Sequence, residues 1–242
     1  MAQSSSNELA GKIALVTGAS RGIGAAICEV LAGKGANLIL NYTSESSTQR
    51  TQGLASRIQS QYGVKAIVVQ ADMGTTDGPG HIIEQAVKSF ADLGLEKADS
   101  FQLDILINNA GVSVNLPIEE CHAEDFAFQY NINVRGPLLL MKAAIDYLPH
   151  DRSGRIVNLS SVSASLGFVG QSVYGGTKAA LEAMTRTWAR ELAPRATVNA
   201  VNPGPVATDM VSIVIPWPSS KANSRSMVVQ RFRRLPIECA RS

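Results

Sequence analysis

Short apolar runs alternate with longer helical stretches along most of the chain, which predicts strands followed by helices. Six runs are expected to form strands: Lys12–Thr17, Asn37–Tyr42, Val64–Gln70, Leu103–Ile107, Arg155–Leu159 and Thr197–Val201. Helices are expected at Ile23–Lys34, Glu45–Gln61, Gly80–Ala91, Glu124–Leu148 and Ser172–Leu192. Strands and helices that alternate in this way indicate right-handed crossovers and a parallel sheet.

Residues with distinctive chemistry follow directly after several of these predicted strands. Gly18, Asn108, Ser161 and Pro203 all come just past a strand end. In an open parallel sheet, ligands bind beyond the carboxyl ends of the strands. The sequence therefore predicts an α/β fold with a Rossmann-type doubly wound parallel sheet, helices on both faces and a ligand site at that edge.

The first strand leads into the glycine-rich turn Thr17-Gly-Ala-Ser-Arg-Gly-Ile-Gly24 and then into a helix. Glycines allow a tight turn and a close backbone approach to a pyrophosphate, and the helix N-terminus supplies amide donors. An ordinary tight turn is the alternative, but the position after the first strand favours dinucleotide binding. The residues expected to bind the cofactor here are Gly18, Ser20, Arg21, Gly22, Ile23 and Gly24.

The end of the second predicted strand bears on which dinucleotide is bound. Binders of NAD usually place Asp or Glu there to hold the ribose 2′-hydroxyl, but this strand ends in Asn41-Tyr-Thr-Ser44, with no acid before Glu45. Arg21, in the glycine-rich turn, can instead meet a 2′-phosphate. Although Arg21 could be a solvated turn residue, both features favour NADP (NADPH) over NAD.

Candidate catalytic groups lie between Ser161 and Lys178. Tyr174 and Lys178 are four residues apart, so a helix places both side chains on one face. A lysine ammonium beside a tyrosine is expected to lower the tyrosine pKa and so prepare it for proton transfer to or from a carbonyl oxygen. Ser161 can hydrogen-bond the same oxygen. Taken alone, the Tyr–Lys pair could be an accident of a solvated helix.

Composition narrows the remaining classes of function. The 242 residues suit a single domain, 45% of them are hydrophobic, and the formal net charge is only +2, which predicts no general affinity for nucleic acid or membranes. Three unpaired cysteines and three scattered histidines give no metal-ligand spacing, so no metal is expected. The polar N-terminus is not a secretory signal, and no apolar run is long enough to span a bilayer. We expect a cytoplasmic protein.

Taken together, these motifs resemble the short-chain dehydrogenase/reductase family in its compact single-domain branch, and most closely its 3-oxoacyl-carrier-protein reductase-type members. The matching segments, in the family's order, are Thr17–Gly24, Asn108–Gly111, Asn133, Ser161, Tyr174–Lys178 and Asn202–Thr208. The resemblance implies that Tyr174 is the general acid in reduction and that Ser161 orients the carbonyl. Lys178 would hold the nicotinamide ribose and tune Tyr174.

The resemblance also implies roles for residues outside this triad. Asn133 would support a water in a proton relay, although it could equally be a helix-bending residue, and Asp72 would contact the adenine. Further residues would line the cofactor cleft, and Thr208 would bond the nicotinamide carboxamide; the set is Asn109, Ala110, Gly111, Pro203, Gly204, Val206 and Thr208.

The resemblance ends near Met210, so we expect a catalytic domain over residues 1–210 and an atypical basic tail over 211–242. No glycine follows Gly204, which predicts that the family's seventh strand is missing and leaves six strands. The tail has six basic residues and a single acid, Glu238. A basic arm for nucleic acid or acidic lipid is one interpretation. A disordered terminus produced by altered splicing or a shifted frame is the favoured one.

The function that follows is NADPH-dependent reduction of a ketone or 3-oxoacyl group to a secondary alcohol. The partners expected are a small carbonyl substrate and, as in the family, further copies of the chain in a homodimer or homotetramer. A non-catalytic NADP-binding protein and an inactive truncated variant remain as alternatives. The identity of the substrate and the physiological direction stay open.

Overall fold

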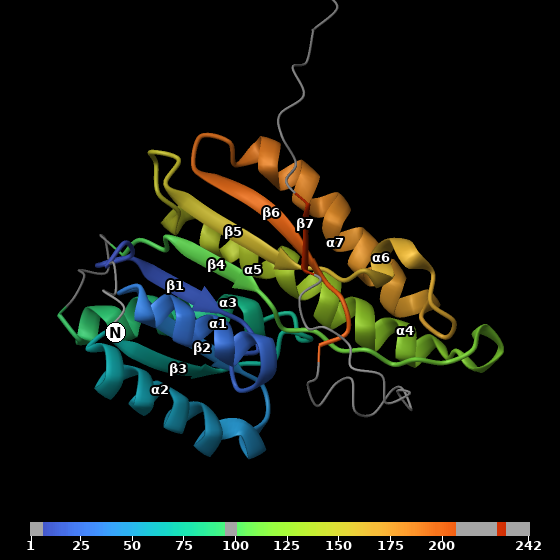
Figure 1. The fold of residues 1–242 in the computed structure, drawn as a ribbon, viewed down its shortest axis with the longest axis horizontal. Helices are drawn as coiled ribbons and strands as arrows, with labels where there is room; N and C mark the ends of the chain where they lie inside the picture. The colour runs from blue at the N-terminus through green and yellow to red at the C-terminus, as the bar shows by residue number, and fades with distance from the viewer. Residues whose placement is uncertain (1–6, 95–100, 207–226, 231–242) are drawn as a thin grey trace, which may run out of the picture.

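The computed structural model describes residues 7–94, 101–206 and 227–230. Its strands form one sheet in the spatial order β3-β2-β1-β4-β5-β6-β7 (Figure 1). The first six strands pair in parallel, which confirms the doubly wound sheet. They are β1 (Ile13–Val16), β2 (Asn37–Tyr42), β3 (Ala66–Gln70), β4 (Ile105–Asn108), β5 (Gly154–Leu159) and β6 (Ala196–Pro203).

The outer edge of β6 differs from the expectation of a missing seventh strand. A four-residue strand, β7 (Met227–Gln230), pairs with β6 in the antiparallel direction, with Pro203 opposite Met227. The sheet therefore has seven strands, of which six are parallel, where the sequence predicted six in all. An edge strand presents a row of unpaired backbone groups, and a short extended segment can pair with them in either direction.

All five predicted helical stretches are present among the described residues, with ends shifted by a few positions. They are α1 (Gly22–Gly33), α2 (Thr48–Tyr62, after the short η1, Glu45–Ser47), α3 (Gly78–Asp92), the stretch from α4 (Ala123–Tyr130) to α5 (Gly136–Ala144), and α7 (Ser172–Glu191). Single helical turns lie at η3 (Ile118–Glu120), η5 (Ile145–Tyr147) and α6 (Ser163–Leu166). No helix in these ranges has the length and apolar character needed to cross a bilayer. The cytoplasmic location stays a prediction.

Two apolar cores cover the two faces of the sheet (Figure 1). On one face, α3, α5 and α7 pack against the sheet through fully buried side chains such as Phe90 and Leu140, together with Trp188. On the other face, α1 and α2 pack through Cys28 and Ile58. Because β1 lies between these layers, all four of its residues are buried, as expected for a central parallel strand.

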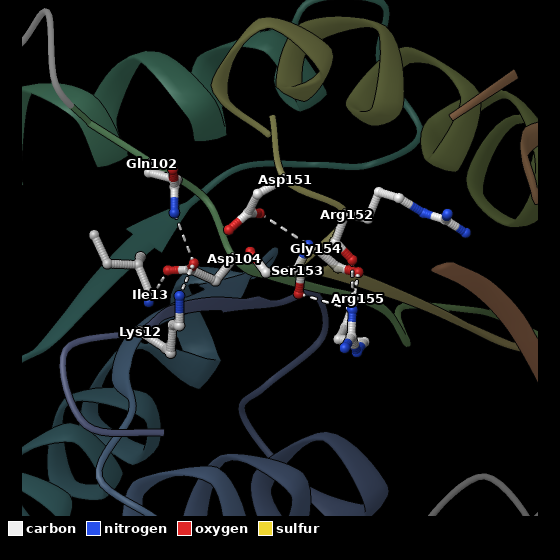
Figure 2. Close-up of polar contacts among 9 residues, drawn as sticks. All are labelled: Lys12, Ile13, Gln102, Asp104, Asp151, Arg152, Ser153, Gly154 and Arg155. Atoms are coloured by element: carbon white, nitrogen blue, oxygen red, sulfur yellow. Dashed lines mark hydrogen bonds and ion pairs between the residues drawn. The ribbon is translucent and has the colours of Figure 1, made fainter. Parts of the chain in front are cut away.

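A polar cluster joins β1 to β4 at the amino edge of the sheet (Figure 2). The Asp104 side chain, only 6% exposed, accepts hydrogen bonds from Lys12 Nζ at 2.8 Å, Ile13 N at 2.9 Å and Gln102 Nε2 at 2.9 Å. The backbone of Asp104 also pairs with Ile13 and Arg155. This edge is fixed by contacts between residues that are far apart in the sequence.

Candidate active site

The glycine-rich turn between β1 and α1 has the geometry of a phosphate cradle. Gly18 and Gly22 have φ values of 63° and 57°, in the left-handed region that favours glycine. A Cβ at Gly24 would lie 2.4 Å from the Gly18 carbonyl oxygen and 2.6 Å from Asn109 Nδ2. Only a bare backbone fits here, and the free amides of the first turn of α1 follow directly. The chain thus offers the backbone that a dinucleotide pyrophosphate needs.

A group of hydrogen bonds fixes the glycine-rich turn against the end of β4. Thr17 Oγ1 accepts hydrogen bonds from the Asn109 and Ala110 amides, both at 3.0 Å. Asn109 Nδ2 in turn donates to the carbonyl oxygens of Thr17 at 2.8 Å and Gly18 at 3.2 Å. In the structure Asn109 therefore holds the glycine-rich turn in place and so shapes the cleft. The sequence placed Thr17 at the start of the glycine-rich turn but assigned no contact to its side chain.

The end of β2 also supports the turn. Asn41 is fully buried, and its Nδ2 donates to the carbonyl oxygens of Val69 and Ala71, at 3.3 and 3.1 Å. Its Oδ1 accepts from the Gly18 amide at 3.4 Å. This residue stands where NAD binders carry an acid, and its side chain is engaged within the protein. Asp72, expected near the adenine, is exposed and accepts a hydrogen bond from Gly74 N at 2.8 Å.

Ser161, Tyr174 and Lys178 come together at the carboxyl edge of β5. Ser161 lies two residues after β5 and is 8% exposed, and its hydroxyl donates to Ser163 Oγ at 3.0 Å and acts on Tyr174 by lowering the pKa of the phenol. The Ser161 hydroxyl is also held by Ser163, whose amide donates to it at 3.1 Å. Lys178 is 4% exposed, its Nζ lies 5.7 Å from the centroid of the Tyr174 ring, and it donates a hydrogen bond to the Leu159 carbonyl oxygen at 2.8 Å.

The neighbouring Ser160 faces a different partner. Its hydroxyl donates to Glu182 Oε1 at 2.9 Å, and Asn202 Nδ2 donates to the same oxygen at 2.6 Å. Glu182, from α7, therefore ties the ends of β5 and β6 together beneath the triad. The sequence interpretation missed this residue, although it lies one helical turn beyond Lys178 on the same side of the helix.

The electrostatics of the triad correct one expectation. The pKa of Tyr174 is raised above its ordinary value, because burial disfavours the phenolate more than the Ser161 hydrogen bond favours it. Burial also lowers the pKa of Lys178 to about 8. The prediction that an adjacent ammonium lowers the Tyr174 pKa is therefore wrong for this structure, because desolvation is the largest cause of the shift and raises that pKa.

Asn133 lies in a π-helical turn, η4 (Asn131–Arg135), between α4 and α5. Its Oδ1 accepts from Val112 N at 2.9 Å, and its Nδ2 donates to the Val112 carbonyl oxygen at 2.8 Å and to Thr177 Oγ1 at 3.0 Å. The position of a Cβ on Gly111 would lie 3.3 Å from both Asn133 Oδ1 and Lys178 Nζ. Asn133 thus lies in the π-helical turn beside the triad, and its roles as a helix-bending residue or a water-holding one both stay predictions.

The loop after β6 closes this edge. Pro203 accepts a hydrogen bond from Val162 N at 3.2 Å, which places the start of the loop beside Ser161. Gly204 and Val206 follow it, whereas Thr208 lies outside the described residues. Gly175 allows a further close approach, because a Cβ there would lie 2.8 Å from the Ser163 carbonyl oxygen. The glycine after Tyr174 therefore lets α7 approach the serine loop.

Comparison with known proteins gives the family. The sequence profile described as short chain dehydrogenase matches residues 12–218. The chain is 52% identical over 207 residues to an L-xylo-3-hexulose reductase of Hypocrea jecorina, covering 83% of this chain and 68% of the relative. It is also 52% identical over 215 residues to an L-xylulose reductase of Aspergillus niger, with coverage of 85% and 70%.

A solved structure agrees in fold and cofactor. A blue fluorescent protein from a metagenomic library, in complex with NADPH, superposes with a TM-score of 0.76 at 38% identity, covering 84% of this chain and 78% of that protein. The glycine cradle described above fits the same cofactor. The chain belongs to the short-chain dehydrogenase/reductase family, and it is an NADP-dependent oxidoreductase acting on CH–OH and C=O groups.

Proposed function

We propose that this protein reduces a ketone on a small molecule to a secondary alcohol, with Tyr174 as the proton donor. The observation that carries the proposal is the meeting of Ser161, Tyr174 and Lys178 beside the glycine cradle, where the Ser161 hydroxyl acts on the Tyr174 phenol and the Lys178 ammonium lies 5.7 Å from the centroid of its ring. Two hydroxyls in this relation can both donate to one carbonyl oxygen. The raised pKa of Tyr174 keeps its phenol protonated, as a proton donor must be.

The proton and the hydride have separate sources in this reaction. NADPH, when bound, supplies the hydride to the carbonyl carbon. Tyr174 donates its phenolic proton to the carbonyl oxygen, and Ser161 orients that oxygen. Lys178 is proposed to favour the phenolate that forms, and a proton from solvent restores the tyrosine. Because both polar atoms of the Asn133 side chain are engaged, we propose that it contributes by holding the π-helical turn beside Lys178.

For the substrate we place a polyhydroxy ketone first. The two relatives at 52% identity are named for the reduction of keto sugars. A 3-oxoacyl thioester remains the second candidate, from the family resemblance of the motifs. The other cofactor contacts expected from the sequence, which run from Asp72 to Thr208, are also proposals. The division of the chain into a catalytic domain and a tail near Met210 is a further proposal.

The test is NADPH consumption with a panel of L-xylulose, other ketoses, small diketones and a 3-oxoacyl thioester. Tyr174→Phe is expected to lower kcat by roughly 10³-fold, as the loss of a general acid does, while NADPH still binds. Tyr147→Phe is the matched control, because Tyr147 packs edge-on against Phe101 at 5.6 Å, in the core cluster with α5. Equal rates for wild type and Tyr174→Phe would contradict the role of Tyr174. NADPH binding without turnover on any ketone would favour the non-catalytic alternative.

We further propose that the chain forms the homodimer or homotetramer expected from the family. Large apolar side chains on α4 and α5 support this, since Phe126, Phe128 and Leu138 are each 46–50% exposed. Light scattering after size exclusion tests the proposal. A mass corresponding to one chain at micromolar concentration would contradict it.

A further inference from the structure

A cavity of about 380 Å³ opens between the glycine-rich turn and helix α2. One wall comes from the turn and the start of α1, and the other comes from α2. None of the residues that line it is acidic, and three of the six are arginines: Ser20, Arg21, Ala25, Arg50, Leu54 and Arg57. A concave site with this charge favours an anion with several oxygen acceptors.

The α2 wall is built from one face of the helix. Arg50, Leu54 and Arg57 follow the spacing i, i+4 and i+7, so their side chains project in the same direction. Leu54 is 3% exposed and packs into the apolar core between α1 and α2. This anchor fixes the rotation of α2 about its axis and directs Arg50 toward the cavity.

The two arginines of α2 differ in how their charges are balanced. Arg57 Nη2 lies 2.7 Å from Glu29 Oε1 on α1, so its charge already has a partner. Arg50 is exposed and makes no ion pair or side-chain hydrogen bond with any residue that the structure describes. It also stands in the first turn of α2, where no acidic residue lies and where the helix dipole disfavours a cation. An anion in the cavity would relieve this unfavourable placement.

We propose that Arg50 is a specificity-determining residue that, together with Arg21, binds the phosphate monoester on the adenosine ribose of NADPH. The proposal rests on the cofactor-dependent function proposed above. Arg21 borders the cavity from the glycine-rich turn, and the Ser20 hydroxyl adds a neutral donor. Arg57, neutralised by Glu29, forms the far wall. A dianionic phosphate gains from two guanidinium groups, whereas the 2′-hydroxyl of NADH offers them no charge.

The test measures binding by the full chain, without turnover. NADPH and NADH are titrated against wild type, Arg50→Gln and the control Arg190→Gln, and the dissociation constants are read from cofactor fluorescence. Arg190 is an exposed arginine in the last turn of α7 and does not line the cavity. Arg50→Gln is expected to weaken NADPH about tenfold and NADH less than twofold, which is the loss of one charge-assisted contact. Arg190→Gln is expected to change either constant less than twofold. Arg50→Lys should recover part of the loss, because it keeps the charge and loses the fork geometry.

A second pair of ligands measures the contribution of the 2′-phosphate to affinity apart from that of the rest of the cofactor. Adenosine 2′,5′-bisphosphate should lose affinity for Arg50→Gln by the same factor as NADPH, and adenosine 5′-monophosphate should not. An unchanged NADPH constant in Arg50→Gln, or an equal loss for NADPH and NADH, overturns the proposal. Thermal melting without cofactor shows whether each variant is folded. A wild type that prefers NADPH but reduces no ketone contradicts the proposed function and leaves this inference standing.

Discussion

At the amino edge of the sheet the buried Asp104 carboxylate accepts three hydrogen bonds (Figure 2). At the carboxyl edge several buried polar atoms have no protein partner among the described residues. Among the described residues, the unpaired atoms include Asn108 Oδ1 and Asn202 Oδ1 in the last two residues of β4 and β6, and Gln171 Oε1 and Asn115 Nδ2 in loops, whereas Ser153 Oγ is the unpaired buried atom at the amino edge. Buried polar groups are normally satisfied, and the exceptions tend to mark functional positions. We therefore expect the amino edge to govern stability and the carboxyl edge to govern chemistry.

The largest effect should come from the carboxyl edge, where Ser161→Ala removes one hydroxyl with little change in packing. We expect kcat/KM for the ketone to fall about 10²- to 10³-fold, as on removing one donor to a developing oxyanion. The free energy of unfolding should change by about 1 kcal/mol or less, since the hydroxyl is held only by small neutral partners. Kinetics and urea denaturation on the same preparation measure both quantities.

Ser160→Ala is the matched comparison, because the two serines are adjacent and only Ser160 hydrogen-bonds Glu182. It leaves a half-buried carboxylate with one donor fewer, so stability should fall more than activity. If Ser160→Ala removed activity and Ser161→Ala did not, the choice between the two serines would be reversed.

At the amino edge the expected effect is on stability. Asp104→Ala should lower the free energy of unfolding by about 3 to 4 kcal/mol, because it leaves the buried Ile13 amide and the Lys12 ammonium without their acceptor. The kcat at a temperature well below the melting transition should stay within about twofold of wild type. Lys12→Met should lower the free energy of unfolding by less, about 1 kcal/mol, because two donors to Asp104 remain and the Lys12 side chain is 39% exposed. A large loss of kcat in folded Asp104→Ala would contradict the expectation that the amino edge governs stability and the carboxyl edge governs chemistry.

The contrast also shows what the sequence could predict. Apolar runs such as Ile13–Val16 are local features of the sequence. They therefore allowed us to predict the six parallel strands, their order along the chain and a site at one edge of the sheet. The meeting of Ser161 with Tyr174 followed from motif spacing, because both sit at fixed distances from a strand or helix end.

The features that were missed depend on tertiary contacts. The hydrogen-bond donors of Asp104 include residues 91 and 92 positions away, and Glu182 is defined by partners on two other strands. The sign of the Tyr174 pKa shift depends on burial, which a helical spacing does not encode. The short β7 strand carries no glycine signature, and its pairing depends on the open edge of β6.

The pH dependence of stability sharpens the comparison, because it isolates one buried group at the carboxyl edge. The pKa of Lys178 is lowered by burial from 10.5 to about 8, so between these values the unfolded chain binds more protons than the folded one. Stability from this group therefore rises as the pH increases through that window, and at neutral pH the buried ammonium is a cost. The raised pKa of Tyr174 acts oppositely, but only above pH 10.

Lys178→Met should remove this dependence. The difference in unfolding free energy between the variant and wild type should shift against the variant by about 2 kcal/mol from pH 7 to pH 10. Urea denaturation without cofactor at several pH values measures it, and Lys142→Met, at an exposed position on α5, is the control. A difference that is flat across this range would mean that Lys178 keeps its ordinary pKa.

The smallest effect is expected at the exposed turn of the amino edge. Arg152 has a φ of 68°, and it is the non-glycine residue with a positive φ among those that the structure describes. Its carbonyl oxygen accepts a hydrogen bond from Arg155 at 3.0 Å, which any residue can maintain. Arg152→Gly should raise the unfolding free energy by about 0.5 kcal/mol, because relief of the left-handed strain slightly exceeds the added entropy of the unfolded chain. Arg152→Ala keeps the left-handed backbone strain and removes the guanidinium, so it distinguishes the effect of the backbone conformation from the effect of the charge. If alanine stabilised the protein as much as glycine, the effect would come from charge at this edge rather than from its backbone, and kcat should be unchanged in both variants.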